Sequence, residues 1–254
     1  MSPPNAAIRF EGVAKVFDRG DGREPVHAVR DLDLEVADGE CLCLIGTSGC
    51  GKTTILRLVN RLLEPTRGRV LVGGVDVATL DPIALRRSMG YVIQSGGLFP
   101  HMTVAGNVGL LCRLEGWESE RARARVAELL ERVHLPADEF ADRYPSALSG
   151  GQRQRVGVAR ALALDPRIVL LDEPFGALDR ITRARVQEEF LELRKSEGRT
   201  MILVSHDLDE ARRLGDRIGI MSEGTLLQVG TWEELSDAPA TGFVARFVQE
   251  VAGA

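Results

Sequence analysis

The stretch Cys41-Leu42-Cys43-Leu44-Ile45-Gly46-Thr47-Ser48-Gly49-Cys50-Gly51-Lys52-Thr53 joins an apolar run directly to a glycine-rich loop. The apolar run at 41–45 is typical of a strand buried in a parallel sheet. Residues 46–53 fit the pattern G-x-x-x-x-G-K-[ST], whose glycines let the backbone curl and aim N–H groups at phosphate oxygens. A helix is predicted from about residue 52 to residue 63, and the positive end of its dipole favours an anion at this loop. The stretch therefore predicts a strand, a phosphate-binding loop and a helix in succession.

The rest of the chain predicts an α/β fold around this unit. Helical and apolar stretches alternate beyond residue 152, which favours a parallel sheet with right-handed crossovers. Residues 8–36 contain the apolar alternation of half-buried strands. The other predicted elements are helix 152–163, strand 168–171, helix 183–195, strand 200–204, and hairpins at 70–77 and 218–229 that turn at Gly73-Gly74 and Ser222-Glu223-Gly224.

Residues 98–147 differ from this core because their pattern is helical. Apolar residues in the predicted helix 117–133 recur at helical spacing, at Val126, Leu129, Leu130 and Val133. The arginines of this helix are expected to lie in solvent, namely Arg121, Arg123 and Arg125. The expected domain ranges are a core with an N-terminal antiparallel β subdomain at 1–94 and 152–235, an inserted helical subdomain at 95–151 and a short C-terminal tail at 236–254.

Composition argues against several classes of protein. The net charge of −5 disfavours a general nucleic-acid binder, because phosphate binding needs a cationic surface. No apolar run approaches the roughly 20 residues that span a bilayer, and the N-terminus lacks the pattern of a secretory signal. The four cysteines form no CxxC pair, so we expect a cytosolic protein with reduced thiols. A role at a membrane is then expected to come through a partner chain.

A pair of carboxylates ends the apolar run at 168–171. Carboxylates at the C-terminal end of a strand in an open α/β sheet face the crevice where ligands bind. Asp172 is therefore a candidate Mg²⁺ ligand together with the Thr53 hydroxyl, and Glu173 is a candidate general base for an attacking water. Lys52 is expected to reach the β- and γ-phosphates. Alternatively, the two carboxylates cap the element that follows them.

Three further motifs are ambiguous when each is taken alone. Ser149-Gly150-Gly151 precedes a predicted helix and is either a second anion site or a simple helix cap. Gln94 follows an apolar stretch and is either functional or a solvated loop residue. His206 follows the strand at 200–204 and is either functional or structural. Spacing leaves open whether the two phosphate-binding helix ends meet in one chain or across a dimer.

The order of these motifs resembles the nucleotide-binding subunit of an ABC transporter, over about residues 8 to 235. The matching motifs are the phosphate loop, Gln94, Leu148-Ser149-Gly150-Gly151-Gln152, Asp172-Glu173, Ala177-Leu178-Asp179 and His206. The resemblance implies an α/β fold of the P-loop NTPase (RecA-like) type and an ATPase activity that uses ATP and Mg²⁺. It also implies a homodimer or pseudo-dimer that encloses two ATP molecules.

The resemblance further implies roles for individual residues. Glu173, His206, Gln94 and Lys52 are expected to be catalytic. Mg²⁺ is expected on Thr53, Gln94 and Asp172, and Phe17 is expected to stack on adenine unless it is an ordinary core residue. The residues expected to bind nucleotide are Phe17, Gly46, Thr47, Ser48, Gly49, Cys50, Gly51, Lys52, Thr53, Thr54, Ser149, Gly150, Gly151, Gln152 and Asp179.

Four longer stretches look like the ATPases of osmoprotectant importers for glycine betaine, choline or proline. They are Val59-Asn60-Arg61-Leu62-Leu63-Glu64-Pro65-Thr66, Tyr91-Val92-Ile93-Gln94, Gly97-Leu98-Phe99-Pro100-His101-Met102-Thr103 and Phe175-Gly176-Ala177-Leu178-Asp179-Arg180-Ile181-Thr182. This resemblance implies permease subunits that contact Leu98 to Val104, an extracytoplasmic substrate-binding protein, no nucleic acid, and a place at the cytoplasmic face of the inner membrane. Many relatives carry C-terminal regulatory modules of the cystathionine-β-synthase type, which we do not expect here because the chain ends at Ala254.

Two alternatives stay open at this point. The first is an ABC importer with another cargo, such as an amino acid, an anion or a lipid, since nothing in the chain touches cargo. The second is a soluble ABC protein that acts on DNA or ribosomes. That class usually has long coiled coils or two cassettes in one chain, and this sequence has neither.

Overall fold

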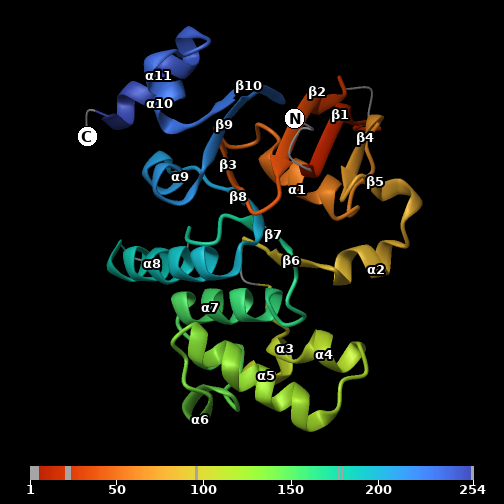
Figure 1. The fold of residues 1–254 in the computed structure, drawn as a ribbon, viewed down its shortest axis with the longest axis vertical. Coiled ribbons are helices and arrows are strands. Elements are labelled where there is room, and N and C mark those ends of the chain that lie inside the picture. The colour runs from red at the N-terminus through yellow and green to blue at the C-terminus, as the bar shows by residue number, and fades with distance from the viewer. Residues whose placement is uncertain (1–5, 21–23, 95–96, 177, 179, 253–254) are drawn as a thin grey trace. The chain divides into compact units, whose positions relative to one another are not determined.

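A computed structural model describes residues 6–20, 24–94, 97–176, 178 and 180–252 (Figure 1). The chain divides into two compact units, which we describe separately. Unit 1 comprises Met1–Arg86 and Gly198–Ala254, and unit 2 comprises Arg87–Glu197. The domain ranges given above stay a prediction.

Unit 1 contains an antiparallel sheet with the strand order β2-β1-β4-β5. Ile8, Phe10 and Val13 of β1 are almost fully buried. Alternation predicts this for Ile8 and Phe10, and a register shift against β2 between Phe10 and Val13 accompanies the odd spacing of Val13. Gly73 and Gly74 both have positive φ, at 56° and 79°, and form the turn of the predicted hairpin. The strands are β1 (Ala6–Phe17), β2 (Val26–Ala37), β4 (Arg67–Val72) and β5 (Val75–Asp76).

Unit 1 also contains the strand that precedes the phosphate loop, β3 (Cys41–Gly46). It is buried along its whole length and pairs in parallel with β8 (Thr200–Val204) and with β9 (Arg217–Ser222). The antiparallel β10 (Thr225–Gly230) follows at the edge and completes the predicted closing hairpin. The helices and turns of this unit are α1 (Lys52–Val59), η1 (Val77–Thr79), α2 (Pro82–Arg87), α9 (Leu208–Leu214), α10 (Trp232–Asp237) and α11 (Gly242–Ala252).

The helix after the phosphate loop is shorter than predicted. Helix α1 ends at Val59, whereas the sequence predicted an end near residue 63. Arg61 has a φ of +52°, which a helix cannot contain. The N–H of Leu63 closes the end by donating to the Arg57 carbonyl at 2.9 Å, while the Asn60 side chain accepts from the N–H of Leu62. The first of these bonds satisfies a carbonyl that the last helical turn leaves without a partner.

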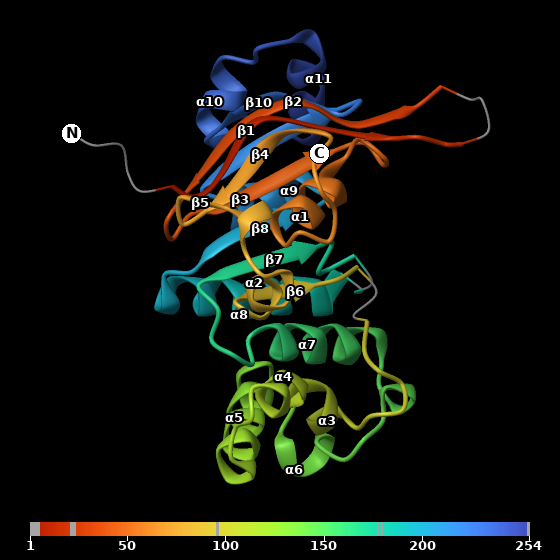
Figure 2. The same cartoon turned by 90° about the vertical axis from the view of Figure 1, so that its right-hand side faces the viewer.

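Unit 2 combines two parallel strands with helices. Strand β6 (Met89–Val92) pairs with β7 (Ile168–Asp172). Helix α7 (Gly150–Ala161) lies between this pair and the helices α3 to α6, which lie inside the range predicted to be helical (Figure 2). The remaining elements are α3 (Val104–Val108), α4 (Leu110–Leu114), α5 (Ser119–Arg132), α6 (Ala137–Phe140), η2 (Pro145–Ala147) and α8 (Arg180–Glu197).

The prediction that all three arginines of α5 lie in solvent is wrong for Arg125. Its side chain is only 14% exposed and donates to the carbonyls of Leu162 at 3.0 Å and Ala163 at 3.2 Å. These carbonyls lie at the C-terminal end of α7, where helix geometry leaves acceptors unused and the dipole favours a cation. Arg123 is exposed, and Arg121 stacks on Trp117 with its guanidinium carbon 3.8 Å from the ring centre.

Arg125 should therefore contribute to stability. We expect Arg125→Met to lower the free energy of unfolding by about 1–3 kcal/mol, because two buried carbonyls lose a charged donor. Urea denaturation measures this loss. Arg123→Met, on the same helix, should change stability by no more than about 0.5 kcal/mol. An equal loss of unfolding free energy in both variants would show that the bonds from Arg125 to the two carbonyls do not stabilise the protein specifically.

All four cysteines are buried thiols that form no disulfide, namely Cys41, Cys43, Cys50 and Cys112. Burial raises the pKa of the Cys112 thiol. Within the ranges that the structure describes, no helix combines the length and the apolar character needed to cross a membrane.

Candidate functional site

The phosphate loop connects β3 to α1, and its shape depends on two glycines. Gly46 has a φ of +147°, and a Cβ there would lie 2.1 Å from the carbonyl oxygen of Met221 on β9. Gly51 has a φ of +107°, and a Cβ there would lie 2.0 Å from the carbonyl oxygen of Ala28 on β2. Any side chain would collide with backbone at both points. The sequence pattern and the close packing therefore require glycine at the same two positions.

The loop presents hydrogen-bond donors and positive charge. No side chain caps the start of α1, and its first turn contains no acidic residue. The N–H groups of that turn and the helix dipole therefore favour an anion. Lys52 is 6% exposed, and its Nζ donates to the carbonyls of Gly46 at 2.7 Å and Thr47 at 3.1 Å. This donor set fits the oxygens of a nucleotide phosphate chain.

His206 comes to the same edge of unit 1 as the phosphate loop. Strands β3 and β8 run in parallel with Leu44 opposite Val204, so both chains leave the sheet at the same end. The N–H of Ser205 donates to the Leu44 carbonyl at 3.0 Å, which ties the start of the His206 loop to β3. His206 itself is exposed. The structure thus brings together two motifs that lie about 150 residues apart in the sequence.

The loop that carries His206 is held by groups that the sequence analysis did not identify. The Ser205 hydroxyl bonds to the buried carboxylate of Glu210 and accepts from the N–H of Asp207 at 3.0 Å. Asp207 in turn caps α9 by accepting from the N–H of Glu210 at 3.1 Å. The only signal in the sequence was a capping residue three positions before a glutamate.

In unit 2, Gln94 and Glu173 form a direct pair. Strands β6 and β7 are parallel with Val92 opposite Leu171, so the residues that follow them meet at one edge. The Nε2 of Gln94 donates to the Oε2 of Glu173 at 2.9 Å. Gln94 is exposed, but this bond makes it more than a solvated loop residue. Asp172 ends β7 and is 3% exposed.

Glu173 has an unusual backbone conformation. Its φ is +47°, in the left-handed region that few residues other than glycine adopt. It also precedes Pro174, and residues before proline normally favour extended conformations. Such strain persists only where surrounding structure imposes it, and it concentrates at functional sites.

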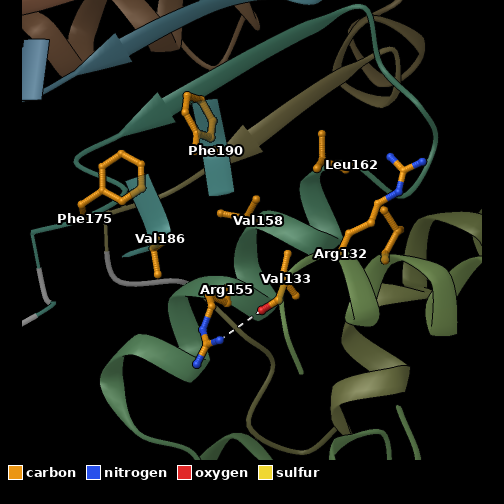
Figure 3. Close-up of a pocket in the computed structure, with 9 residues that line it drawn as sticks. Arg132, Val133, Arg155, Val158, Leu162, Phe175, Val186 and Phe190 are labelled. Atoms are coloured by element: carbon orange, nitrogen blue, oxygen red, sulfur yellow. Dashed lines mark hydrogen bonds between the residues drawn. The ribbon is translucent and has the colours of Figure 1, made fainter. Parts of the chain in front are cut away.

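The chain after Glu173 is anchored by apolar packing. Phe175 is 1% exposed and meets Phe190 of α8 edge to face, with ring centres 5.8 Å apart. Both rings border a small cavity of about 30 Å³ (Figure 3). The cavity is lined by Leu129, Arg132, Val133, Arg155, Val158, Leu162, Phe175, Val186 and Phe190. This packing holds the backbone two residues beyond Glu173 between α7 and α8.

The Ser149-Gly150-Gly151 motif forms a capping box at the start of α7. The Ser149 hydroxyl accepts from the N–H of Gln152 at 3.2 Å, and the Gln152 side chain accepts from the N–H of Ser149 at 2.8 Å. A Cβ on Gly151 would lie 3.1 Å from Leu178, so a larger residue is tight there. The cap interpretation is confirmed, and the first-turn N–H groups still give this end the character of an anion site.

The other predicted site residues lie in separate places. Phe17 ends β1 and is half-buried, with the Lys15 ammonium 5.1 Å from its ring centre, so it is not an ordinary core residue. Thr53 and Thr54 lie in the first turn of α1 and are half-buried. Asp179 and Ala177 lie outside the described residues. The phosphate loop and His206 belong to unit 1, whereas Gln94, Ser149 and Glu173 belong to unit 2.

The chain is similar to many known proteins. A family model described as ABC transporter matches residues 29–176. The glycine betaine/carnitine/choline transport ATP-binding protein of Bacillus subtilis is 48% identical over 95% of this chain and 62% of its own length. The osmoprotectant import ATP-binding protein of Salmonella typhimurium is 46% identical over 95% of this chain and 63% of its own length. This chain therefore spans less than two thirds of either relative.

A shorter relative and a solved structure agree with these matches. The glycine betaine uptake system ATP-binding protein of Escherichia coli is 45% identical over 94% of this chain and 76% of its own length. A dimeric ATP-binding cassette in a post-hydrolysis state, bound to ADP and phosphate, has a TM-score of 0.81. It is 33% identical and covers 88% of this chain and 98% of its own. With the phosphate loop, the capping box at Ser149 and the Gln94–Glu173 pair in place, the chain belongs to the ABC transporter family.

Proposed function

We propose that this chain is the ATP-binding and ATP-hydrolysing subunit of an ABC importer for an osmoprotectant such as glycine betaine, choline or proline. The observation that carries the ATPase proposal is the 2.9 Å bond between Gln94 and Glu173 at the ends of adjacent parallel strands. The osmoprotectant class is supported by relatives of 45–48% identity that are named for glycine betaine, carnitine, choline or osmoprotectant transport.

Residues of the phosphate loop would hold the nucleotide. The N–H groups from Gly46 to Thr53 would bind phosphate oxygens, and the Lys52 ammonium would exchange its loop carbonyls for the β- and γ-phosphates. Thr53, Gln94 and Asp172 are the proposed Mg²⁺ ligands. When bound, Mg²⁺ would neutralise the charge that develops on the phosphates. Phe17 would stack on the adenine ring.

Glu173 is the proposed general base. Its carboxylate would accept a proton from the attacking water, and Gln94 would hold that carboxylate and the water in line. His206, at the edge beside the phosphate loop, would donate to the γ-phosphate. The Ser205 and Asp207 bonds on either side of His206 would keep its loop in place.

The second anion site would act across a dimer. We propose that Ser149, Gly150 and Gly151 of one copy bind the γ-phosphate held by Lys52 of the other, with Gln152 completing the cap and Asp179 lying near the shared nucleotide. The similar solved cassettes are dimers. Each ATP would then lie between a phosphate loop and a signature helix from different copies, so nucleotide binding would close the dimer and hydrolysis would open it.

The proposed membrane partners would contact the segment after Gln94. Phe99 exposes 41% of its surface and meets His101 edge to face at 5.9 Å, which gives the segment from Leu98 to Val104 an apolar point of contact. We place permease subunits there, at the cytoplasmic face of the inner membrane. An extracytoplasmic binding protein would deliver the cargo.

Uptake of labelled glycine betaine tests the whole proposal. Cells that lack other betaine transporters would express the chain with its permease, as wild type or as Glu173→Gln at equal levels. A matched control is Glu223→Gln, because Glu223 is an exposed glutamate with the same φ of +47° in a turn. We expect wild-type and Glu223→Gln cells to accumulate betaine and Glu173→Gln cells to fail. Equal uptake by all three strains would exclude glycine betaine as the cargo. Uptake of labelled choline and of labelled proline would then be measured in the same three strains.

A further inference from the structure

Arg160 joins the helix of the signature motif to the loop that follows Gln94. It lies in the last turn of α7, and its Nη1 donates to the carbonyl of Gly97 at 2.8 Å. Its guanidinium carbon lies 6.0 Å from the centre of the Phe99 ring. Burial lowers the pKa of this guanidinium from its usual range. A charged donor in a desolvated position makes a stronger bond than an exposed one.

A second residue holds the same loop from α3. Asn107 is fully buried and accepts from the N–H of Phe99 at 2.7 Å. Its Nδ2 donates to the carbonyls of Phe99 at 3.1 Å, Met102 at 3.2 Å and Thr103 at 3.0 Å. The segment from Gly97 to Thr103 is thus attached to α3 through Asn107 and to α7 through Arg160.

The Gly97 end of this segment also contacts the residue before Gln94. Gly97 has a φ of +50°, and a Cβ there would lie 2.0 Å from the Cδ1 of Ile93. The backbone at Gly97 therefore packs directly on the Ile93 side chain. A shift of the Gly97 backbone toward Ile93 would press on this side chain, and Ile93 is followed in the chain by Gln94, which donates to Glu173.

Helix α7 carries Ser149 at its start and Arg160 near its end. Its 12 residues form a rod of about 18 Å, at 1.5 Å per residue. The helix packs on β6, α3 and α5. A rigid shift of α7 would carry its Ser149 end and the Gly97 carbonyl together, through the bond from Arg160.

We propose that Arg160 is a positioning residue that couples the signature helix to the Gln94–Glu173 pair. When α7 shifts, Arg160 would shift the backbone at Gly97 with it and so set the distance between Gln94 and Glu173. The inference rests on the proposed ATPase function, and it adds a role that the motif residues do not explain. Arg160 itself would contact neither the nucleotide nor the attacking water.

A double-mutant cycle on the full chain tests the coupling. We expect Arg160→Met to lower kcat for ATP hydrolysis about tenfold with little change in KM, because Arg160 bonds to Gly97, whereas Lys52 of the phosphate loop bonds to Gly46 and Thr47. Arg160→Lys, which keeps one charged donor, should recover part of the loss. In a Gln94→Ala background, Arg160→Met should cause little further loss, since both changes break the same chain of contacts. Arg123→Met serves as the control, because Arg123 is an exposed arginine of the same unit.

The possible outcomes are distinct. Losses that multiply in the double variant, or a kcat for Arg160→Met equal to that of Arg123→Met, would overturn the coupling role. Hydrogen exchange of the peptide covering 93–104 provides a second readout, and it should accelerate in Arg160→Met but not in Arg123→Met. If Glu173→Gln retained wild-type turnover, the ATPase proposal would fail first. If Glu173→Gln lost turnover while Arg160→Met kept it and its exchange was unchanged, only the Arg160 inference would be wrong.

Discussion

Glu173→Gln is expected to lower ATP turnover by about 10²–10⁴-fold while ATP still binds. General base catalysis contributes a factor of this size, and an amide cannot accept the proton. Glutamine has the same shape as glutamate, and its amide oxygen can still accept from the Nε2 of Gln94. The substitution therefore removes the proton acceptor and keeps the hydrogen bond from Gln94. ATP-bound dimers should accumulate because the step that opens them is blocked.

Phosphate release under steady-state conditions measures the turnover, and size-exclusion chromatography with ATP and Mg²⁺ detects the trapped dimer. Glu223→Gln should behave like the wild type in both assays, since Glu223 lies in the β9–β10 turn. A turnover rate of Glu173→Gln within a few-fold of the wild-type rate would contradict the assignment of Glu173 as the general base.

Ser149→Arg is expected to abolish hydrolysis, by at least about 100-fold, without weakening ATP binding to the monomer. The first effect follows because a large cation at the start of α7 would replace the small cap and block the proposed γ-phosphate contact across the dimer. The second effect is expected because, in the proposed dimer, Ser149 would contact the nucleotide held by Lys52 of the other copy. The lost cap itself should cost about 1 kcal/mol of stability.

Another capping box in this chain provides the control. Thr231 at the start of α10 caps by the same pair of bonds, with Glu234 in place of Gln152. Thr231→Arg loses an equivalent cap and should keep ATPase activity. Fluorescent ATP analogues measure binding to the monomer at low protein concentration. A loss of monomer affinity in Ser149→Arg would contradict the shared site, because the signature motif would then serve its own nucleotide.

Features set by neighbouring residues could be predicted from the sequence. The buried strand, glycine-rich loop and following helix at 41–59 depend on apolar runs, glycines and spacing that are local to the chain. The same holds for the hairpins at Gly73-Gly74 and at 222–224, where positive φ favours glycine. One local prediction was wrong: α1 ends at Val59 and not near residue 63, because Arg61 adopts a left-handed conformation that no sequence pattern indicated.

Contacts between distant segments could not be predicted in this way. The Gln94–Glu173 bond depends on the parallel register of β6 and β7, which brings together residues 79 positions apart. The sequence predicted that Arg125 is a surface residue, but its guanidinium donates to carbonyls at the C-terminal end of α7 and is mostly buried there. The bonds from Arg160 to Gly97 and between Asn107 and Phe99 likewise depend on how the segment 97–103 packs on α7 and α3.

The sequence by itself determined the family and the phosphate loop, and it predicted the roles of Asp172 and Glu173, because short motifs need particular residues at fixed spacing. Only the tertiary structure decided which side chains hold those motifs in place. The physical reason is that a hydrogen bond between distant segments depends on strand register and helix packing, and these are settled by burial of the whole core.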